Sequence, residues 1–306
     1  MNSRQKEVAI LLPCYNEAAA ISEVVASFKL ACPDATIYVY DNNSTDGTPE
    51  VARDAGAVVR HVPKQGKGNV VQHMFMEIEA DIYVMADGDG TYDAETAPLM
   101  IETLIQESAD MVVGVRKHES DSAYRHGHQF GNKMLNKMVE WSFGEKVGDM
   151  LSGYRIFSRR FVKSFPLLSK GFEIETEITV HALSLQLRVV NVETKYHDRA
   201  EGTASKLHTY KDGFRILSAI ALLVKYEHPF YFFSIISFIL VLLSLFVGGG
   251  VVLEFLNTQY ITKIPSAILA TGLMLSALIC FSLGVVLDSV SRGQKQFKKL
   301  TYLSTK

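Results

Sequence analysis

Residues 82–93 have the sequence Ile-Tyr-Val-Met-Ala-Asp-Gly-Asp-Gly-Thr-Tyr-Asp, in which a short apolar run ends in two carboxylates one residue apart. The apolar run over 82–86 has the length of a strand and ends in a turn signal, which indicates a buried strand. Asp87 and Asp89 then lie at its carboxyl end, where open α/β sheets bind their ligands. Two hard carboxylate ligands suit Mg²⁺ or Mn²⁺ carrying a diphosphate, and the glycines allow a phosphate close to the backbone. The alternative is an acidic turn that only caps the strand.

Strand-like and helix-like segments alternate around this stretch. Apolar runs predict strands over 7–13, 36–40, 57–62, 110–115, 156–157 and 189–196. Helices are predicted over 17–30 with Asn16 as N-cap, from Pro49, from about residue 69 to 80, and from Pro98 to about 107. Alternating elements with short connections predict a mostly parallel sheet with helices on both faces.

Polar side chains follow each predicted strand of the N-terminal half. They are Asn16 and Glu17, then Asp41, then Lys64 and Lys67, and finally Asp87 and Asp89. The carboxyl ends of parallel strands lie on one edge of a sheet. We therefore expect carboxylates for base, ribose and metal to gather at that edge, together with lysines for phosphates.

Residues beyond 116 add polar groups whose roles the sequence leaves open. Residues 148–155 form a predicted polar turn before a strand. The segment 171–179 carries Glu173, Glu175 and Glu177, which form a solvated face or include one side chain in the site. His126 and His128 lack the spacing of helical metal ligands, so we expect exposed polar residues.

The C-terminal third changes character. No charged residue occurs from Pro229 to Leu253 or from Ile264 to Leu287, and each run is long enough to cross a hydrocarbon core of ~30 Å. Before them, residues 206–228 alternate basic and apolar side chains, as in an interfacial amphipathic helix. The alternatives are two buried core helices and a helix packed on the domain. The basic tail after residue 290 predicts cytoplasmic termini by the positive-inside rule.

Composition restricts the partners and the compartment. The formal net charge is −2, so we expect no nucleic-acid partner. The three cysteines are far apart, which favours free thiols in a reducing compartment. The first seven residues run straight into a predicted strand, so we expect no signal peptide. Gly248–Gly250 and Gly272 would allow close packing against a partner helix, which leaves a homo-oligomer open.

Six segments of the chain form a recognisable set: L-L-P-C-Y-N-E-A (11–18), Y-D-N-N-S-T-D-G-T (40–48), K-Q-G-K-G-N (64–69), A-D-G-D-G (86–90), D-M-L-S-G-Y-R (149–155) and R-A-E-G-T-A-S-K (199–206). Together they resemble family 2 glycosyltransferases of the polyprenyl-phosphate type, similar to dolichol-phosphate mannose synthases and undecaprenyl-phosphate glucosyltransferases. The resemblance implies a GT-A type, Rossmann-like α/β fold. It also implies a catalytic domain over 1–205, the interfacial helix over 206–228, two transmembrane helices within 229–290 and a cytoplasmic tail over 291–306.

The resemblance implies roles for residues at the matching positions. For the donor these are Pro13, Tyr15, Glu17, Asp41, Asn43, Lys67, Asp87 and Arg116. For the acceptor phosphate they are Arg155, Arg199, Ser205 and Lys206. The implied catalytic residues are Asp149, Asp89 and Arg125. The implied Mg²⁺ or Mn²⁺ ligands are Asp89 and Asp87, with Thr91 where some mannose synthases have a metal-binding Gln.

The implied reaction is an inverting transfer of a sugar from a nucleotide-sugar to an undecaprenyl or dolichyl phosphate in the bilayer. UDP-glucose or UDP-N-acetylglucosamine is the favoured donor, with GDP-mannose next. A phosphate monoester is largely dianionic at neutral pH, so the acceptor needs little deprotonation before it attacks. The protein is then an integral membrane protein, and a bacterial inner membrane fits best.

Two other functions remain open from the sequence. A processive polysaccharide synthase shares such a catalytic half but usually carries a Gln-x-x-Arg-Trp motif, and the single tryptophan, Trp141, follows Met138-Val139-Glu140. A non-catalytic membrane adaptor on a transferase scaffold is the second alternative. The intact Asp87, Asp89, Lys67 and Asp149 argue against it.

Overall fold

The structure is a computed structural model that describes residues 6–118, 137, 139–140, 143, 148–166, 174–197, 225–260 and 262–305. The chain divides into two compact units. One comprises residues 1–216 together with 298–306, and the other comprises residues 217–297. Each unit is described by itself below.

The first unit is built on a seven-stranded sheet with the order β3-β2-β1-β4-β6-β5-β7. The strands are β1 (Val8–Cys14), β2 (Thr36–Asp41), β3 (Val58–His61), β4 (Ile82–Met85), β5 (Met111–His118), β6 (Arg155–Ser158) and β7 (Val189–Tyr196). Only β6 runs antiparallel to its neighbours, β4 and β5; the other pairs are parallel. The prediction of a mostly parallel sheet is confirmed.

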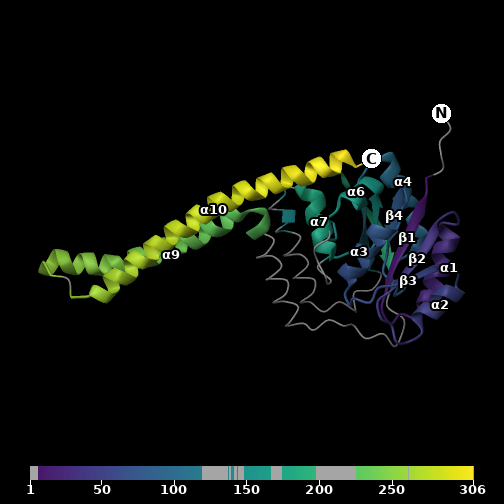
Figure 1. Cartoon of the computed structure of the whole chain (residues 1–306), viewed down its shortest axis with the longest axis horizontal. Coiled ribbons are helices and arrows are strands. Elements are labelled where there is room, and N and C mark those ends of the chain that lie inside the picture. The colour runs from purple at the N-terminus through teal and green to yellow at the C-terminus, as the bar shows by residue number, and fades with distance from the viewer. Residues whose placement is uncertain are drawn as a thin grey trace. The chain divides into compact units, whose positions relative to one another are not determined.

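Helices cover both faces of this sheet (Figure 1). They are α1 (Ile21–Ala31), α2 (Thr48–Asp54), α3 (Lys67–Glu77), the short η1 (Ala94–Thr96), α4 (Ala97–Gln106), α6 (Arg159–Ser164) and α7 (Ile174–Ser184). Pro49 and Pro98 lie in the first turns of α2 and α4, as predicted.

Each face of the sheet carries its own apolar core. In β1, Leu11 packs with α3, α6 and α7, whereas Ile10 and Leu12 pack with α1, α2 and α4. All three side chains have no exposed surface. Alternate residues of a strand point to opposite faces, so a strand buried on both sides must be apolar throughout. This explains why the strand segments are continuous apolar runs.

The start of α1 differs from the prediction. The helix begins at Ile21, and its N-cap is Ala20 without a side-chain cap. Asn16 adopts a left-handed backbone with φ 55°, and its Oδ1 accepts a hydrogen bond from the Thr45 N–H at 2.8 Å. The side chain therefore joins two loops instead of capping a helix, because asparagine tolerates the left-handed region and bonds backbone groups locally.

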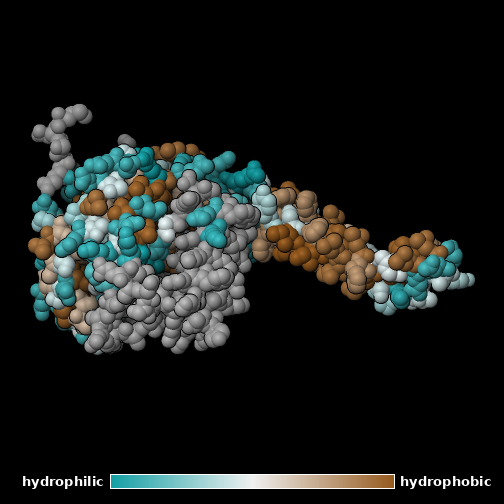
Figure 2. All heavy atoms as spheres, turned by 180° about the vertical axis from the view of Figure 1, so that it is seen from behind, coloured by the Kyte–Doolittle hydropathy of each residue, from teal (hydrophilic) through white to brown (hydrophobic). Residues whose placement is uncertain are grey.

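The second unit contains α9 (Pro229–Thr258) and most of α10 (Ile264–Ser304). Both helices are long and apolar enough to cross a membrane, with mean hydropathy reaching 2.7 and 2.2. Their apolar side chains face outward: Phe238, Leu245 and Leu278 are 63%, 59% and 63% exposed (Figure 2). Such exposure argues against the alternative of buried core helices.

Small and hydroxyl side chains join these two helices. The Ser237 and Ser244 hydroxyls donate to the carbonyl oxygens of Ala277 and Ala270, each at 2.8 Å. At Gly248 an added Cβ would lie 3.2 Å from the Ala270 Cβ. Close approach of this kind is typical of helix pairs in lipid.

The basic cytoplasmic tail over 291–306 stays a prediction, and the structure describes these residues up to 305. Helix α10 continues to Ser304, and residues 298–306 belong to the first unit. Tyr302 is 6% exposed, and its hydroxyl donates to Asp110 Oδ1 at 2.6 Å. The Lys299 ammonium donates to the Leu185 carbonyl at 2.7 Å. Burial of the Tyr302 ring within the first unit thus fixes this end of the chain. The predicted interfacial helix lies outside the described residues except for 225–228.

Candidate active site

The carboxyl ends of β1, β2 and β4 bring the predicted acidic residues together. Cys14 at the end of β1 pairs in register with Asp41 at the end of β2, and β4 lies on the other side of β1. Burial raises the pKa of the Cys14 thiol well above its usual value, and the carboxylates of Glu17, Asp41, Asp87 and Asp89 raise it further. The expected gathering of carboxylates around one sheet edge is therefore present.

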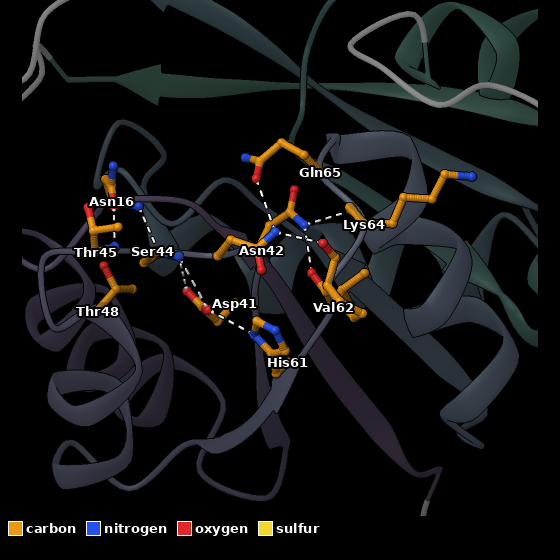
Figure 3. A network of polar contacts seen from close by, with 12 residues as sticks. Asn16, Asp41, Asn42, Ser44, Thr45, Thr48, His61, Val62, Lys64 and Gln65 are labelled. Carbon is orange, nitrogen blue, oxygen red and sulfur yellow. Dashed lines mark hydrogen bonds and ion pairs between the residues drawn. The ribbon is translucent and has the colours of Figure 1, made fainter.

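Hydrogen bonds join the loop after β2 to the loop after β1 (Figure 3). The Asn16 N–H donates to Ser44 Oγ and the Glu17 N–H donates to Thr48 Oγ1, both at 2.9 Å. The Thr48 hydroxyl donates to Asp46 Oδ1 at 2.5 Å. These bonds fix the backbone that carries Pro13, Tyr15 and Glu17. Pro13 and Glu17 are half-buried, and the Tyr15 ring is 38% exposed.

Asp41 and its neighbours hold the loop that leads to Lys67 (Figure 3). Asp41 is 3% exposed, and its carboxylate accepts from the Ser44 N–H and contacts His61 Nδ1 at 3.2 Å. The Asn42 amide donates to the carbonyl oxygens of Val62 and Lys64 and accepts from the Gly66 N–H. Asn43, with φ 67°, donates to the Pro63 carbonyl. The predicted donor residues Asp41 and Asn43 thus also have local structural partners.

Lys67 is the charged centre of the site. Its Nζ lies 2.5 Å from Asp87 Oδ1 and 2.6 Å from Glu175 Oε1. Burial alone would lower the pKa of Lys67, but the two carboxylates outweigh burial and raise it well above its usual value. The ammonium therefore stays charged at every physiological pH. Gly153 packs against Asp87, because a Cβ there would lie 2.7 Å from Asp87 Oδ2.

Asp89 and Thr91 form a small buried motif after β4. Asp89 is 7% and Thr91 is 1% exposed. The Thr91 hydroxyl donates to Asp89 Oδ1 at 2.7 Å, and the Thr91 N–H donates to the same oxygen at 3.2 Å. Thr91 therefore orients the Asp89 carboxylate in this structure.

Asp149 pairs with Arg116 from β5. Arg116 Nε lies 2.6 Å from Asp149 Oδ2, and Nη2 lies 3.0 Å from Oδ1. The two side chains are 12% and 8% exposed. The Arg116 guanidinium also lies over the Tyr196 ring, 5.4 Å from its centroid. Two parallel hydrogen bonds and a stacked ring fix the orientation of this pair.

Arg155 lies inside the domain, and its side chain has no exposed surface. The contact with the acceptor phosphate that the resemblance implies stays a prediction. Its guanidinium donates to the carbonyl oxygens of Ser152 and Met150 and to the Thr179 hydroxyl. Burial lowers its pKa to about 10, which leaves it charged. Arg155 thus holds the 149–153 loop from within the domain.

Four predicted site residues lie outside the described residues: Arg125, Arg199, Ser205 and Lys206. The histidines His126 and His128, together with Glu173, also lie there. Their placement stays a prediction.

The structure adds residues that sequence reasoning did not assign. Glu175 was one of three candidate glutamates, and its carboxylate contacts the Lys67 ammonium. Tyr92 is 9% exposed and accepts the Gly153 N–H at its hydroxyl oxygen, 2.8 Å away. The Ser152 hydroxyl donates to the Gly114 carbonyl at 2.6 Å. An acidic segment and a Tyr beside two aspartates were the only sequence signals for these roles.

The side-chain atoms at the site determine whether it suits a divalent metal ion. Among the described residues, no group of three or more His, Cys, Asp or Glu side chains is arranged to hold a metal ion. Asp87 and Asp89 supply hard carboxylate oxygens at a strand end, and such oxygens suit Mg²⁺ or Mn²⁺. Mg²⁺ commonly takes one or two protein carboxylates and completes its shell with phosphates and water. The residues therefore fit a metal that enters together with a diphosphate.

Comparisons with known proteins agree with this arrangement. The family model for Glycosyl transferase family 2 matches residues 9–165. Glycosyltransferase AglJ of Haloferax volcanii is 32% identical over 302 residues, which cover 97% of this chain and 98% of that protein. An undecaprenyl-phosphate mannosyltransferase of Micrococcus luteus is 26% identical over 220 residues, which cover 64% of this chain and 85% of that one.

A solved structure shows the same fold. The glucosyl-3-phosphoglycerate synthase of Mycobacterium tuberculosis, in complex with Mn²⁺, UDP and glucosyl-3-phosphoglycerate, superposes with a TM-score of 0.58 at 21% identity. The match covers 72% of this chain and 79% of that one. Sheet order, carboxylate placement and sequence similarity have one explanation: the chain belongs to glycosyl transferase family 2.

Proposed function

We propose that this protein transfers one sugar from a nucleotide-sugar to a polyprenyl phosphate in the membrane, with inversion at the anomeric carbon. One observation carries the proposal. A family 2 catalytic domain, with Asp87, Asp89 and Lys67 at one sheet edge, is followed in the same chain by two helices that could cross a membrane. A lipid-borne acceptor explains both parts, and the relative from Micrococcus luteus carries undecaprenyl phosphate in its name.

The charge of the site supports a metal-dependent donor site. The carboxylates of Glu17, Asp41, Asp87 and Asp89 lie around Cys14 at the sheet edge, and the Lys67 ammonium contacts Asp87 and Glu175. Arg116 and Asp149 neutralise each other. A diphosphate brings further negative charge, which such a site repels unless a cation accompanies it. We propose that Asp89 and Asp87 hold Mg²⁺ or Mn²⁺, with Thr91 orienting Asp89.

On the donor side, the residues bind and orient the nucleotide diphosphate. The loops carrying Pro13, Tyr15, Glu17, Asp41 and Asn43 surround the nucleotide, and the Lys67 ammonium lies near the diphosphate. A bound divalent cation supplies Lewis-acid stabilisation of charge on the leaving diphosphate. Lys67 contributes a fixed positive charge to the same developing charge.

On the acceptor side, the phosphate dianion is itself the nucleophile. One of its oxygens forms the bond to the anomeric carbon while the bond from that carbon to the diphosphate oxygen breaks, so an α-linked donor gives a β-linked lipid product. Asp149, held by Arg116, orients the acceptor or excludes water from it. Arg125, Arg199, Ser205 and Lys206 complete the phosphate site in this proposal.

The membrane helices determine where the reaction takes place. Residues 206–228 and α9 and α10 hold the catalytic domain at the headgroups, where the acceptor phosphate lies. Arg292, Lys295, Lys298 and Lys299 follow the second crossing, whereas the segment between the helices carries Glu254 and Lys263. The positive-inside rule therefore places the catalytic domain and both termini in the cytoplasm. A bacterial inner membrane suits this arrangement.

The experiment uses the full chain purified in detergent. It is mixed with undecaprenyl phosphate, Mn²⁺ or Mg²⁺, and radiolabelled UDP-glucose, UDP-N-acetylglucosamine or GDP-mannose in separate reactions. We expect label in the lipid fraction with one of these donors, with the UDP-sugars favoured. The control replaces Asp89 with Ala, which should abolish transfer. No labelled lipid with any donor would overturn the proposed function.

A further inference from the structure

Glu175 is buried next to the donor site and has a specific contact there. It lies in the first turn of α7, is 5% exposed, and reaches the same ammonium as Asp87. We propose that Glu175 is a positioning residue that holds the Lys67 ammonium beside Asp87, with one N–H directed toward the diphosphate of the donor. The inference rests on the proposed function, because that function supplies the diphosphate.

The geometry of Lys67 supports this role. An ammonium group has three N–H donors. Asp87 Oδ1 and Glu175 Oε1 take two of them at 2.5 and 2.6 Å, which leaves one for a third acceptor. A lysine side chain is flexible and has many rotamers, so two fixed partners restrict it more than one. The ammonium is thereby oriented before the donor arrives.

Glu175 interacts with two cations. Asp87 alone neutralises Lys67. Burial lowers the pKa of the Arg155 guanidinium, and the Glu175 carboxylate acts against burial by raising that pKa. The site thus gathers more charged groups than one ion pair needs, and burying charged groups costs folding free energy unless each is paired. Such arrangements are typical of functional sites, where charges are placed for a ligand.

Glu175 is also connected to the loop that carries Asp149. The Thr179 hydroxyl, one turn along α7, donates to the Glu175 carbonyl at 2.9 Å and accepts from the Arg155 guanidinium at 2.8 Å. Arg155 in turn donates to the Met150 carbonyl at 2.6 Å. One chain of contacts thus holds the partner of Lys67 and the 149–153 loop in the same relative position.

The test compares Glu175→Gln with Glu177→Gln, a matched control on the same helix. Binding of UDP and of GDP, each with Mn²⁺, is measured by calorimetry on the full chain, and kcat and KM are measured for transfer. We expect Glu175→Gln to change the Kd of the nucleotide by less than about threefold, because lost positioning and relieved repulsion oppose each other. We expect kcat to fall by about tenfold or more. Glu177→Gln should change neither.

A double-mutant cycle tests whether Glu175 acts through Lys67. In the Lys67→Ala background, Glu175→Gln should cause no further loss of kcat and should tighten nucleotide binding, because only repulsion is removed. Glu175→Asp keeps the charge and should recover part of the kcat lost in Glu175→Gln. It also carries the test if Glu175→Gln does not fold.

Three results would overturn the role of Glu175. They are a Glu175→Gln kcat within about twofold of wild type, an equal loss of kcat in the Lys67→Ala background, or weaker nucleotide binding by the same factor in both backgrounds. Each presupposes that the wild type binds UDP or GDP. A wild type that binds neither would instead overturn the proposed function.

Discussion

Asp149 and Arg116 form a two-point ion pair, with Nε 2.6 Å from Oδ2 and Nη2 3.0 Å from Oδ1. The pair connects the loop before β6 with the end of β5, and the Tyr196 ring supports the guanidinium from β7. The proposed acceptor residue is therefore held in one orientation, and its charge is balanced by a partner whose side chain is nearly as buried.

This pair gives the first prediction. Asp149→Asn keeps the shape but loses the charge, and we expect kcat for lipid glycosylation to fall on the order of 10²-fold. Arg116→Lys should also lower kcat, because lysine cannot form the two-point contact. Steady-state kinetics with the identified donor measure both. Glu193→Gln breaks the exposed Lys117–Glu193 pair on β5 and β7 and is the control, with no expected change. Near-normal activity of Asp149→Asn would exclude an acceptor-side role.

The Asp89–Thr91 contact gives a prediction about the metal. Thr91→Val removes the hydroxyl that donates to Asp89 Oδ1, with little change in size. We expect the Mn²⁺ concentration for half-maximal activity to rise about 10-fold, in the range seen when groups that orient metal ligands are lost. Chelation with EDTA should stop transfer by the wild type, and added Mn²⁺ or Mg²⁺ should restore it. Unchanged metal dependence in Thr91→Val would show that Thr91 does not orient a metal ligand.

Arg155 is predicted to affect stability. Arg155→Met removes a buried guanidinium. The Ser152 and Met150 carbonyls and the Thr179 hydroxyl then lose the hydrogen bonds that this group donates to them. We expect a loss of unfolding free energy of about 3 kcal/mol, since removing one partner from a buried network is costly. Thermal denaturation of the detergent-solubilised chain measures this. A normal melting temperature combined with a raised KM for the lipid would instead support the predicted phosphate role.

His181 on α7 gives a pH prediction. Its ring is 3% exposed, packs against Phe161 and Phe165, and neither ring nitrogen has a hydrogen-bond partner among the described residues. Burial, with a smaller contribution from Lys298, lowers its pKa to about 3. The unfolded chain binds the proton near pH 6.5, so stability contributed by the neutral ring falls as the pH drops from about 6.5 toward 3, by about 1.4 kcal/mol per pH unit.

The measurement compares unfolding of the wild type and His181→Phe at pH 7 and pH 5. Phenylalanine cannot take up a proton, so the variant should lose less stability between the two pH values. An equal loss in both proteins would mean that the His181 ring is protonated in the folded state.

The sheet could be predicted from the sequence because its strands are buried on both faces. The segment 189–196 was predicted with the bounds of β7, and the ends of β1, β2 and β4 were predicted within one residue. Parallel strands place their carboxyl ends on one edge, so the proximity of Lys67 and Asp87 could be expected from the strand ends. The apolar segments indicated where the strands end, and the rule for parallel sheets placed those ends on one edge, so both led to the same site.

The partners within the site could not be predicted in this way. The acidic segment around α7 has Glu at every second residue, and only packing on the sheet turns Glu175 toward Lys67. Arg155 bonds mainly to carbonyl oxygens, which no sequence pattern marks. Asn16 has the composition of a helix cap, yet its left-handed backbone directs it to the next loop. These are tertiary contacts, so they lie beyond local propensity.

The most direct test of the central claim is the mass and linkage of the lipid product. Undecaprenyl phosphate treated with the full chain, Mn²⁺ and the active nucleotide-sugar would be analysed by mass spectrometry, and the anomeric configuration by NMR. We predict a gain of one sugar residue per lipid with β configuration from an α-linked donor, and no product from Asp89→Ala. A ladder of several sugars, an α-linked product, or unmodified lipid with every donor would contradict the account.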